Sequence, residues 1–101
     1  MDSTNSIFTI VESGGVLKLS GRLDIYATET ARTGLLEHFG VLKSMRLDLT
    51  ALEGCDASGL QLLCAARKSA EQAGKSFKAD LSPTVRECIS RLGLTPDFLS
   101  Q

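Results

Sequence analysis

The fold is decided by residues 46–63, which read RLDLTALEGCDASGLQLL. Apolar and polar side chains alternate at the beginning of this stretch, with the period of two that a half-buried strand requires. From residue 60 onward the apolar side chains recur at the spacing of one helix face, and Gly74 is a typical helix stop. The pattern predicts a strand over residues 45–50, a short loop, and a helix that ends near residue 73.

The predicted loop and helix meet at Ser58. Ser58 and Gln61 have the S-x-x-Q spacing of a capping box, in which a hydroxyl and a carboxamide bond backbone N–H groups at a helix start. Ser58 is therefore the expected N-cap, exposed at the junction of loop and helix.

Four segments together resemble the STAS family, the bacterial anti-sigma factor antagonist domains. In that family a hydrophobic strand is followed by Asp-Ser-Ser-Gly-Leu or Asp-Thr-x-Gly-Leu, and residues 56–60 here read DASGL. Residues 21–24 read GRLD, like the family's Gly-x-Leu-Asp, and residues 82–86 and 92–94 read SPTVR and LGL, like its last helix. In order and spacing, the resemblance covers nearly the whole chain.

One position departs from the family pattern. The family's phosphoacceptor is the Ser or Thr directly after the motif Asp, and here that residue is Ala57, which has no hydroxyl. The resemblance therefore leaves Ser58 as the phosphorylation candidate. It also implies a partner-binding surface, formed by Asp24, Asp56, Ala57, Ser58, Gly59 and Leu60.

Composition limits the classes of function. A chain of 101 residues fits one domain, residues 1–101, with residues 1–6 as a flexible N-terminus. Eleven basic and twelve acidic residues give a net charge of −1, which argues against nucleic acid and anionic membranes as partners. No signal peptide and no apolar run of about 18 residues is evident, so we expect a cytoplasmic protein without membrane insertion.

The remaining elements follow from turn and cap signals. Glycines between residues 13 and 16 predict a hairpin of strands over residues 7–11 and 16–19. Thr28 is the expected N-cap of a helix that carries Ala31, Leu35 and Phe39 on one face and ends at Gly40. A strand over residues 76–81, a helix capped by Ser82 and a further turn over residues 95–99 complete the order. The buried face of the last helix is expected to hold Val85, Cys88, Ile89 and Leu92.

This order predicts an α/β fold. It is a small single-domain STAS-like sandwich, with a mixed sheet of four or slightly more strands packed against three to four helices. Asp24 and Asp48 fall near predicted strand ends, and Asp56 and Ser58 on the following loop, so we expect a shared polar rim at one edge of the sheet.

Signals for catalysis are few. The sequence has no phosphate-binding glycine loop and no HExxH metal motif, and we expect no enzyme activity, cofactor or metal. Two alternatives stay open: a reactive thiol at Cys55, before a helix N-terminus, and a Mg²⁺ site at the aspartate rim. The competing interpretations are a buried loop cysteine and aspartates that cap helices and turns. His38 and the other cysteines, Cys64 and Cys88, are expected to be structural.

The resemblance implies a non-enzymatic module that binds a regulatory protein. One hypothesis is an anti-sigma factor antagonist that binds an anti-sigma or chemotaxis-type kinase with the GHKL ATP-binding fold. The alternative is an accessory subunit that binds the ATPase of an ABC-type lipid-transport complex.

Overall fold

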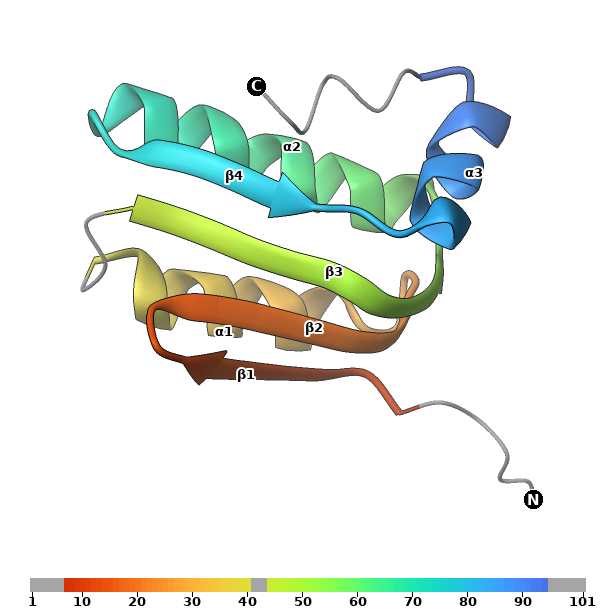
Figure 1. The fold of residues 1–101 in the computed structure, drawn as a ribbon, viewed down its shortest axis with the longest axis horizontal. Helices are drawn as coiled ribbons and strands as arrows, with labels where there is room; N and C mark the ends of the chain where they lie inside the picture. The colour runs from red at the N-terminus through yellow and green to blue at the C-terminus, as the bar shows by residue number, and fades with distance from the viewer. Residues whose placement is uncertain (1–6, 41–43, 95–101) are drawn as a thin grey trace.

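The computed structural model describes residues 7–40 and 44–94. The predicted flexible N-terminus at residues 1–6 and the predicted turn at residues 95–99 lie outside these described residues. Four strands form one sheet: β1 (Thr9–Ser13), β2 (Val16–Leu23), β3 (Ser44–Cys55) and β4 (Ser76–Asp80). Three helices complete the order: α1 (Thr28–Phe39), α2 (Ala57–Gln72) and α3 (Pro83–Arg91). The predicted small α/β fold with a mixed sheet is confirmed (Figure 1).

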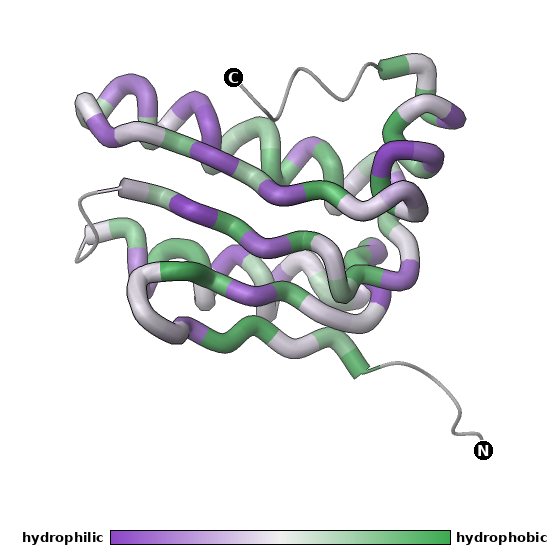
Figure 2. Tube along the Cα trace, in the orientation of Figure 1, coloured by the Kyte–Doolittle hydropathy of each residue, from purple (hydrophilic) through white to green (hydrophobic). Residues whose placement is uncertain are grey.

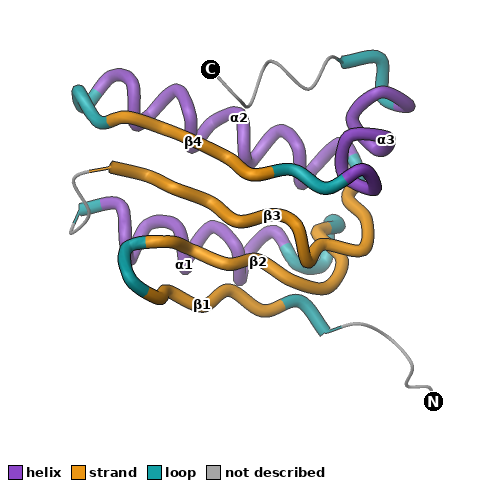
Figure 3. Tube along the Cα trace, viewed as in Figure 1, coloured by secondary structure: helices purple, strands orange, loops and turns teal. Residues whose placement is uncertain are grey.

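The sheet has the strand order β1-β2-β3-β4. β1 and β2 form an antiparallel hairpin around Gly14 and Gly15, whose φ angles of 59° and 85° suit a tight turn. β3 pairs in parallel with both β2 and β4. In Figure 3 a helix connects each pair of parallel strands, α1 from β2 to β3 and α2 from β3 to β4, as parallel connections require.

Helices α1 and α2 lie side by side on one face of the sheet, and α3 packs at the end of β3 (Figure 1). Alternating strand residues point toward the helices, and in Figure 2 hydrophobic and hydrophilic residues alternate along the strands accordingly. The core is largely aliphatic, and its fully buried side chains include Leu17, Leu19, Leu47, Leu49, Leu63, Val85 and Ile89.

Two strands are longer than predicted. β2 continues to Leu23, and β3 continues from the predicted residues 45–50 to Cys55. The extension is sustained by pairing between the two strands, from Ser20 opposite Ala51 to Leu23 opposite Cys55, with one register shift before Ser20 and a second between Gly21 and Arg22. The local pattern of residues 51–55 lacks a regular alternation, so only the pairing reveals the strand.

The start of α1 differs from the prediction. Ala27, and not Thr28, is the N-cap, and no side chain caps it. The Thr28 hydroxyl instead donates to the carbonyl of Ile25 at 2.9 Å.

The end of α1 is held by a residue from the turn after α2. The Lys75 ammonium donates to the Phe39 carbonyl and lies 4.6 Å from the centre of the Phe39 ring. Lys75 therefore stabilises the last turn of α1.

Helix α3 begins as predicted. Ser82 is the N-cap, accepts from the Val85 N–H at 3.2 Å, and precedes Pro83 in the first turn. Val85 and Ile89 are buried and Cys88 is half-buried, as the helical spacing indicated. Leu92 was expected on the same buried face but is exposed, because the helix ends at Arg91 and Leu92 is its C-cap.

Candidate functional site

Strand register brings the turns after residues 21–24 and before residues 56–60 together. Leu23 and Cys55, the last residues of β2 and β3, are opposite each other, so Asp24 and Asp56 follow at the same end of the sheet. The Asp56 N–H donates to the Leu23 carbonyl at 3.2 Å, and the Ile25 N–H donates to Asp56 Oδ2 at 3.2 Å. The loop before α1 and the loop before α2 therefore form one surface.

Asp56 is the N-cap of α2. Its Oδ1 accepts from the Gly59 N–H at 3.1 Å and from the Ser58 hydroxyl at 2.6 Å. The prediction that Ser58 caps this helix is wrong, because α2 begins at Ala57 and Ser58 lies inside its first turn. An ionised carboxylate at this position also meets the positive end of the helix dipole.

The hydrogen bonds around Asp56 determine its protonation. Burial by itself would raise the pKa of Asp56, but the hydrogen bond from the Ser58 hydroxyl and those from the N–H groups of Gly59, Ile25 and Ser58 outweigh it. The pKa is therefore lowered, and Asp56 is an anion at neutral pH.

Asp24 holds the adjacent loop in a similar way. Its Oδ1 accepts from the N–H groups of Tyr26 at 3.0 Å and Ala27 at 3.2 Å. These bonds replace the missing side-chain cap of α1 and fix the backbone between β2 and that helix. Both aspartates therefore use carboxylate oxygens to hold backbone.

The other predicted site residues divide into exposed and buried ones. Ala57 is exposed and Ser58 is half-buried, so both lie at the surface of the motif. Leu60 was expected in the partner-binding surface, but its side chain is only 2% exposed and belongs to the core. Gly59 is buried as well, and a Cβ there would lie 2.8 Å from the Leu23 Cγ. Gly59 and Leu60 thus hold the start of α2 against the core and do not belong to the exposed surface.

Asp48 does not lie at the polar rim where it was predicted. Because β3 continues to Cys55, Asp48 lies in the middle of the strand, paired in register with Lys18 and Asp80, roughly 20 Å before Asp56. Its carboxylate accepts from the Thr50 hydroxyl at 2.6 Å and the Thr50 N–H at 3.0 Å. Within residues 7–40 and 44–94, no three His, Cys, Asp or Glu side chains are grouped so that they could hold a metal ion.

The Cys55 thiol does not have the character of a nucleophile. Burial raises its pKa to about 12, and the adjacent Cys88 thiol adds to the shift. The hypothesis of an activated thiol is therefore wrong, because Cys55 packs under the motif against the core. His38 has the expected structural role, since its Nδ1 lies 2.9 Å from the Gly34 carbonyl oxygen in the preceding turn of α1.

Exposed apolar side chains lie at this end of the sheet, and the sequence interpretation did not identify them. Ile25 and Tyr26 are exposed on the loop before α1, and Leu92 and Leu94 are exposed at the end of α3. Ala57, Leu92 and Leu94 line a groove of about 390 Å³. We call the exposed side chains of Ile25, Tyr26, Ala57, Leu92 and Leu94 the motif face. A signal was available, because Ile25 and Tyr26 are adjacent large side chains within a turn, outside any helix or strand period.

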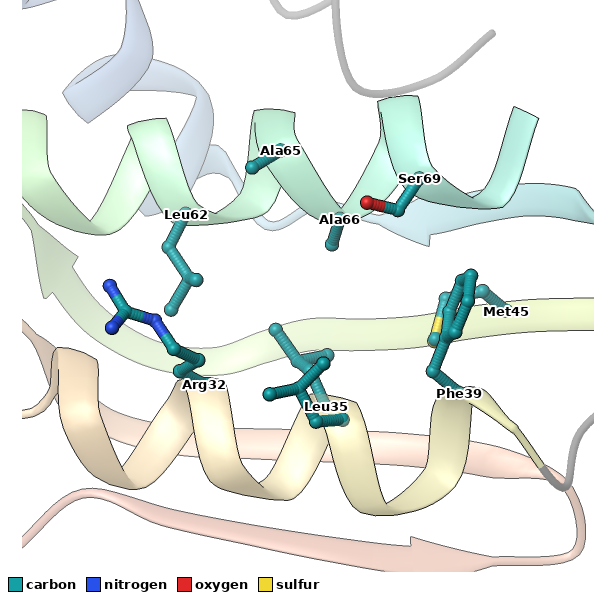
Figure 4. Close-up of a pocket in the computed structure, with 9 residues that line it drawn as sticks. Arg32, Leu35, Phe39, Met45, Leu62, Ala65, Ala66 and Ser69 are labelled. Carbon is teal, nitrogen blue, oxygen red and sulfur yellow. The ribbon is translucent and has the colours of Figure 1, made fainter. Parts of the chain in front are cut away.

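A second hollow lies between α1 and α2 (Figure 4). It has a volume of about 220 Å³, and Leu35 and Phe39 of α1 face Leu62 and Ala66 of α2 across it. Arg32 is the one ionisable side chain in its lining. The hollow between α1 and α2 can accept an apolar side chain, but its lining contains no pair of groups suited to acid–base chemistry.

Residues 8–99 match a protein-family model described as "Mlab, STAS domain". The chain belongs to the STAS domain family. No curated protein sequence matches it significantly. In this STAS protein, no helix among the described residues is long and apolar enough to cross a membrane.

Solved structures support the same fold. An anti-sigma factor antagonist from Mycobacterium paratuberculosis is 20% identical, with a TM-score of 0.71 over 98% of this chain and 96% of that one. The unphosphorylated anti-sigma factor antagonist SpoIIAA is 25% identical, with a TM-score of 0.64 over 89% of this chain and 84% of that one. A putative anti-sigma factor antagonist from Thermotoga maritima is 17% identical, with a TM-score of 0.62 over 85% of this chain and 78% of that one.

Proposed function

We propose that this STAS protein is a non-enzymatic regulatory module that binds a partner protein through the motif face. The family and the anti-sigma factor antagonists among its structural neighbours support a protein partner. The observation that carries the proposal is the position of Asp56, whose carboxylate bonds both the Ile25 N–H and the Gly59 N–H. This double contact joins two loops into one fixed surface around Ala57, at the place where the family carries its phosphoacceptor.

The partner we propose is an anti-sigma factor or chemotaxis-type kinase with the GHKL fold. The STAS protein itself is proposed to be a single-domain cytoplasmic protein. Because Ala57 has no hydroxyl, the motif face keeps its neutral methyl group whatever the activity of that kinase. A phosphate in the family's acceptor position would add roughly 1.5 to 2 negative charges to the contact. Unless another motif residue is phosphorylated, the complex is then regulated by the amounts of the two proteins.

Ser58 remains the phosphorylation candidate within the motif. Its hydroxyl is engaged with Asp56 Oδ1 at 2.6 Å, so a phosphate ester there would remove this donor and add negative charge beside the carboxylate. Modification of Ser58 would therefore weaken the N-cap that also holds Ile25. In this way a single phosphate would disturb both loops of the motif face.

The test uses the kinase of the same organism with ATP. We expect intact-mass analysis to show no phosphate on the unmodified protein, or one phosphate that fragment analysis assigns to Ser58. Ala57→Ser restores the family's acceptor and should gain a phosphate if the partner is an active kinase. Phosphate outside the motif would contradict the proposal.

A second candidate is an accessory subunit that binds an ABC-type ATPase of lipid transport. The exposed methyl group of Ala57 favours it, because a constitutive contact needs no phosphoacceptor. Calorimetry with the purified GHKL kinase and with the purified ABC ATPase distinguishes the two. Binding of the ATPase alone would replace the first candidate by the second.

A further inference from the structure

The hollow between α1 and α2 continues toward the start of both helices. It shares Arg32, Leu62 and Ala65 with a neighbouring hollow of about 290 Å³. Polar side chains from the first two turns of the helices also line this second hollow: Thr28, Ser58 and Gln61. We call the two hollows together the interhelical groove. Along α1 it extends from Thr28 to Phe39, a rise of about 16 Å.

The apolar part of the interhelical groove is open because the facing side of α2 is small. The α2 residues concerned are Ala65, Ala66 and Ser69. Leu35 and Phe39 of α1 lie opposite them, and the buried Met45 of β3 also lines this part, so it reaches the sheet (Figure 4). Leu36, which lines it too, is 65% exposed. The groove therefore leaves apolar surface in water, and an apolar ligand would cover that surface.

Positive charge lies at one end of the apolar part. Among the described residues that line the two hollows, Arg32 is the one charged side chain, and in Figure 4 its guanidinium extends from α1 toward α2. Glu29 pairs with Arg32 at 3.3 Å, but both side chains are largely exposed and such a pair is weak. A guanidinium has five N–H donors, so Arg32 keeps donors for an anionic ligand. The nearby Asp56 carboxylate is held by the N–H groups of Ile25 and Gly59.

The other polar groups of the interhelical groove differ in what they offer. The hydroxyls of Thr28 and Ser58 donate to acceptors within the protein, at 2.9 and 2.6 Å. The exposed Gln61 carboxamide can donate to a ligand beside Arg32. At the far end, Lys75 donates to the carbonyl at the end of α1. Donors for an anion are therefore concentrated at the end near the start of the helices.

The lining favours an alkyl chain over a polypeptide. A polypeptide carries an N–H and a C=O group at nearly every residue, and burying these groups without hydrogen bonds costs free energy. Between Arg32 and the Phe39 end, the described lining of the apolar hollow offers them one polar side chain, Ser69. An alkyl chain needs no hydrogen bonds, and a single anionic end group matches the single cation.

We propose that the interhelical groove binds an aliphatic carboxylate of the fatty-acid class. The alkyl chain lies between α1 and α2 over Met45, and the carboxylate accepts from Arg32 and Gln61. Dodecanoate, when extended, has a length comparable to the groove. This site is separate from the motif face and does not depend on the proposed partner.

Calorimetry with dodecanoate, below the concentration at which it forms micelles, tests the proposal. We expect one dodecanoate per chain. Decanoate should bind roughly threefold to tenfold more weakly, because two methylene groups fewer are buried in a partly open groove. Dodecyltrimethylammonium has the same alkyl chain with the opposite charge, and it should bind at least about tenfold more weakly than dodecanoate.

Two variants locate the ligand. Ala65→Leu places a larger side chain where the two hollows meet, and it should weaken dodecanoate binding at least about tenfold. This variant adds apolar surface, so adsorption to any apolar surface would not decrease. Arg32→Gln should weaken binding about fivefold, because it removes the charge that faces the carboxylate. Arg91→Gln is the matched control, since Arg91 forms a similar exposed pair with Glu87 at 3.3 Å on α3, and it should keep full affinity.

Several outcomes would overturn the proposal. Absence of dodecanoate binding to the unmodified chain would exclude the site. Full affinity in Ala65→Leu would place the ligand outside the interhelical groove. Equal binding of dodecyltrimethylammonium, or equal losses in Arg32→Gln and Arg91→Gln, would show that Arg32 does not recognise a carboxylate. Melting curves that match the unmodified protein confirm that each variant is folded.

Discussion

Helices α2 and α3 both begin at a polar side chain that accepts from the backbone N–H three residues later, yet the two starts have different surroundings. At α3 the Ser82 hydroxyl accepts from Val85, within its own first turn. At α2 the Asp56 carboxylate accepts from Gly59 and also from Ile25, which follows another strand. The start of α3 is a local structure, whereas the start of α2 is part of a tertiary contact. For this reason the local sequence identifies the cap of α3 correctly and misplaces the cap of α2.

The strongest test of this difference is Gly59→Ala. An added Cβ would contact the carbonyl oxygen and the side chain of Leu23, so α2 could not remain in place against the end of β2. We expect a loss of about 3 kcal/mol in the free energy of unfolding, the upper part of the range for overpacking. Urea denaturation measures it. Gly40→Ala is the control, because no atom of the described residues other than its chain neighbours lies within 4 Å of a Cβ there. Equal stability of the two variants would show that α2 does not pack closely on β2.

Asp56→Ala should follow with a loss of about 2 kcal/mol. The substitution removes the N-cap of α2 and the acceptor for the Ile25 N–H together, and caps alone contribute about 0.5 to 2 kcal/mol. Hydrogen exchange should also show faster exchange at the Ile25 amide. If that amide stays protected, the link between the two loops does not depend on Asp56.

Ser82→Ala should cost about 1 kcal/mol, since it removes a cap that acts within one helix. Urea denaturation again gives the value, and exchange at the Ile25 amide should not change. A loss larger than that of Asp56→Ala would reverse the comparison between the two helix starts.

Ser58→Ala should cost less than about 1 kcal/mol, because the Asp56 carboxylate keeps its two backbone donors when the hydroxyl is lost. This variant separates capping from neighbouring hydrogen bonding. A loss as large as that of Asp56→Ala would mean that Ser58 is the true cap.

The smallest effect concerns acid stability. The pKa of Asp56 is lowered from its ordinary value of 3.8, so the folded state binds this proton less readily than the unfolded chain. The resulting stabilisation is complete above the unfolded value and is lost as the pH falls through the lower folded value. We expect Asp56→Asn to flatten the decrease of stability below about pH 4. Asp48→Asn is the comparison far from the motif face, and it should flatten the curve in the same direction, because hydrogen bonds from Thr50 lower the pKa of Asp48 too. Parallel acid curves for the unmodified protein and Asp56→Asn would contradict the assignment.

The sequence by itself determined the order of strands and helices, the hairpin at Gly14 and Gly15, and the cap at Ser82, because each depends on residues within one or two turns of each other. It also indicated the STAS family and the proximity of Asp24 to Asp56, which follows from parallel strands that end at the same edge. Tertiary structure alone decided the length of β3, since residues 51–55 are held by pairing with β2. It also decided that Leu60 is buried while Ile25 and Tyr26 are exposed, because burial depends on which elements pack above a residue. The cap of α2 was also decided by tertiary structure, because the Asp56 carboxylate that caps it is held by the N–H of Ile25, 31 residues away in the chain.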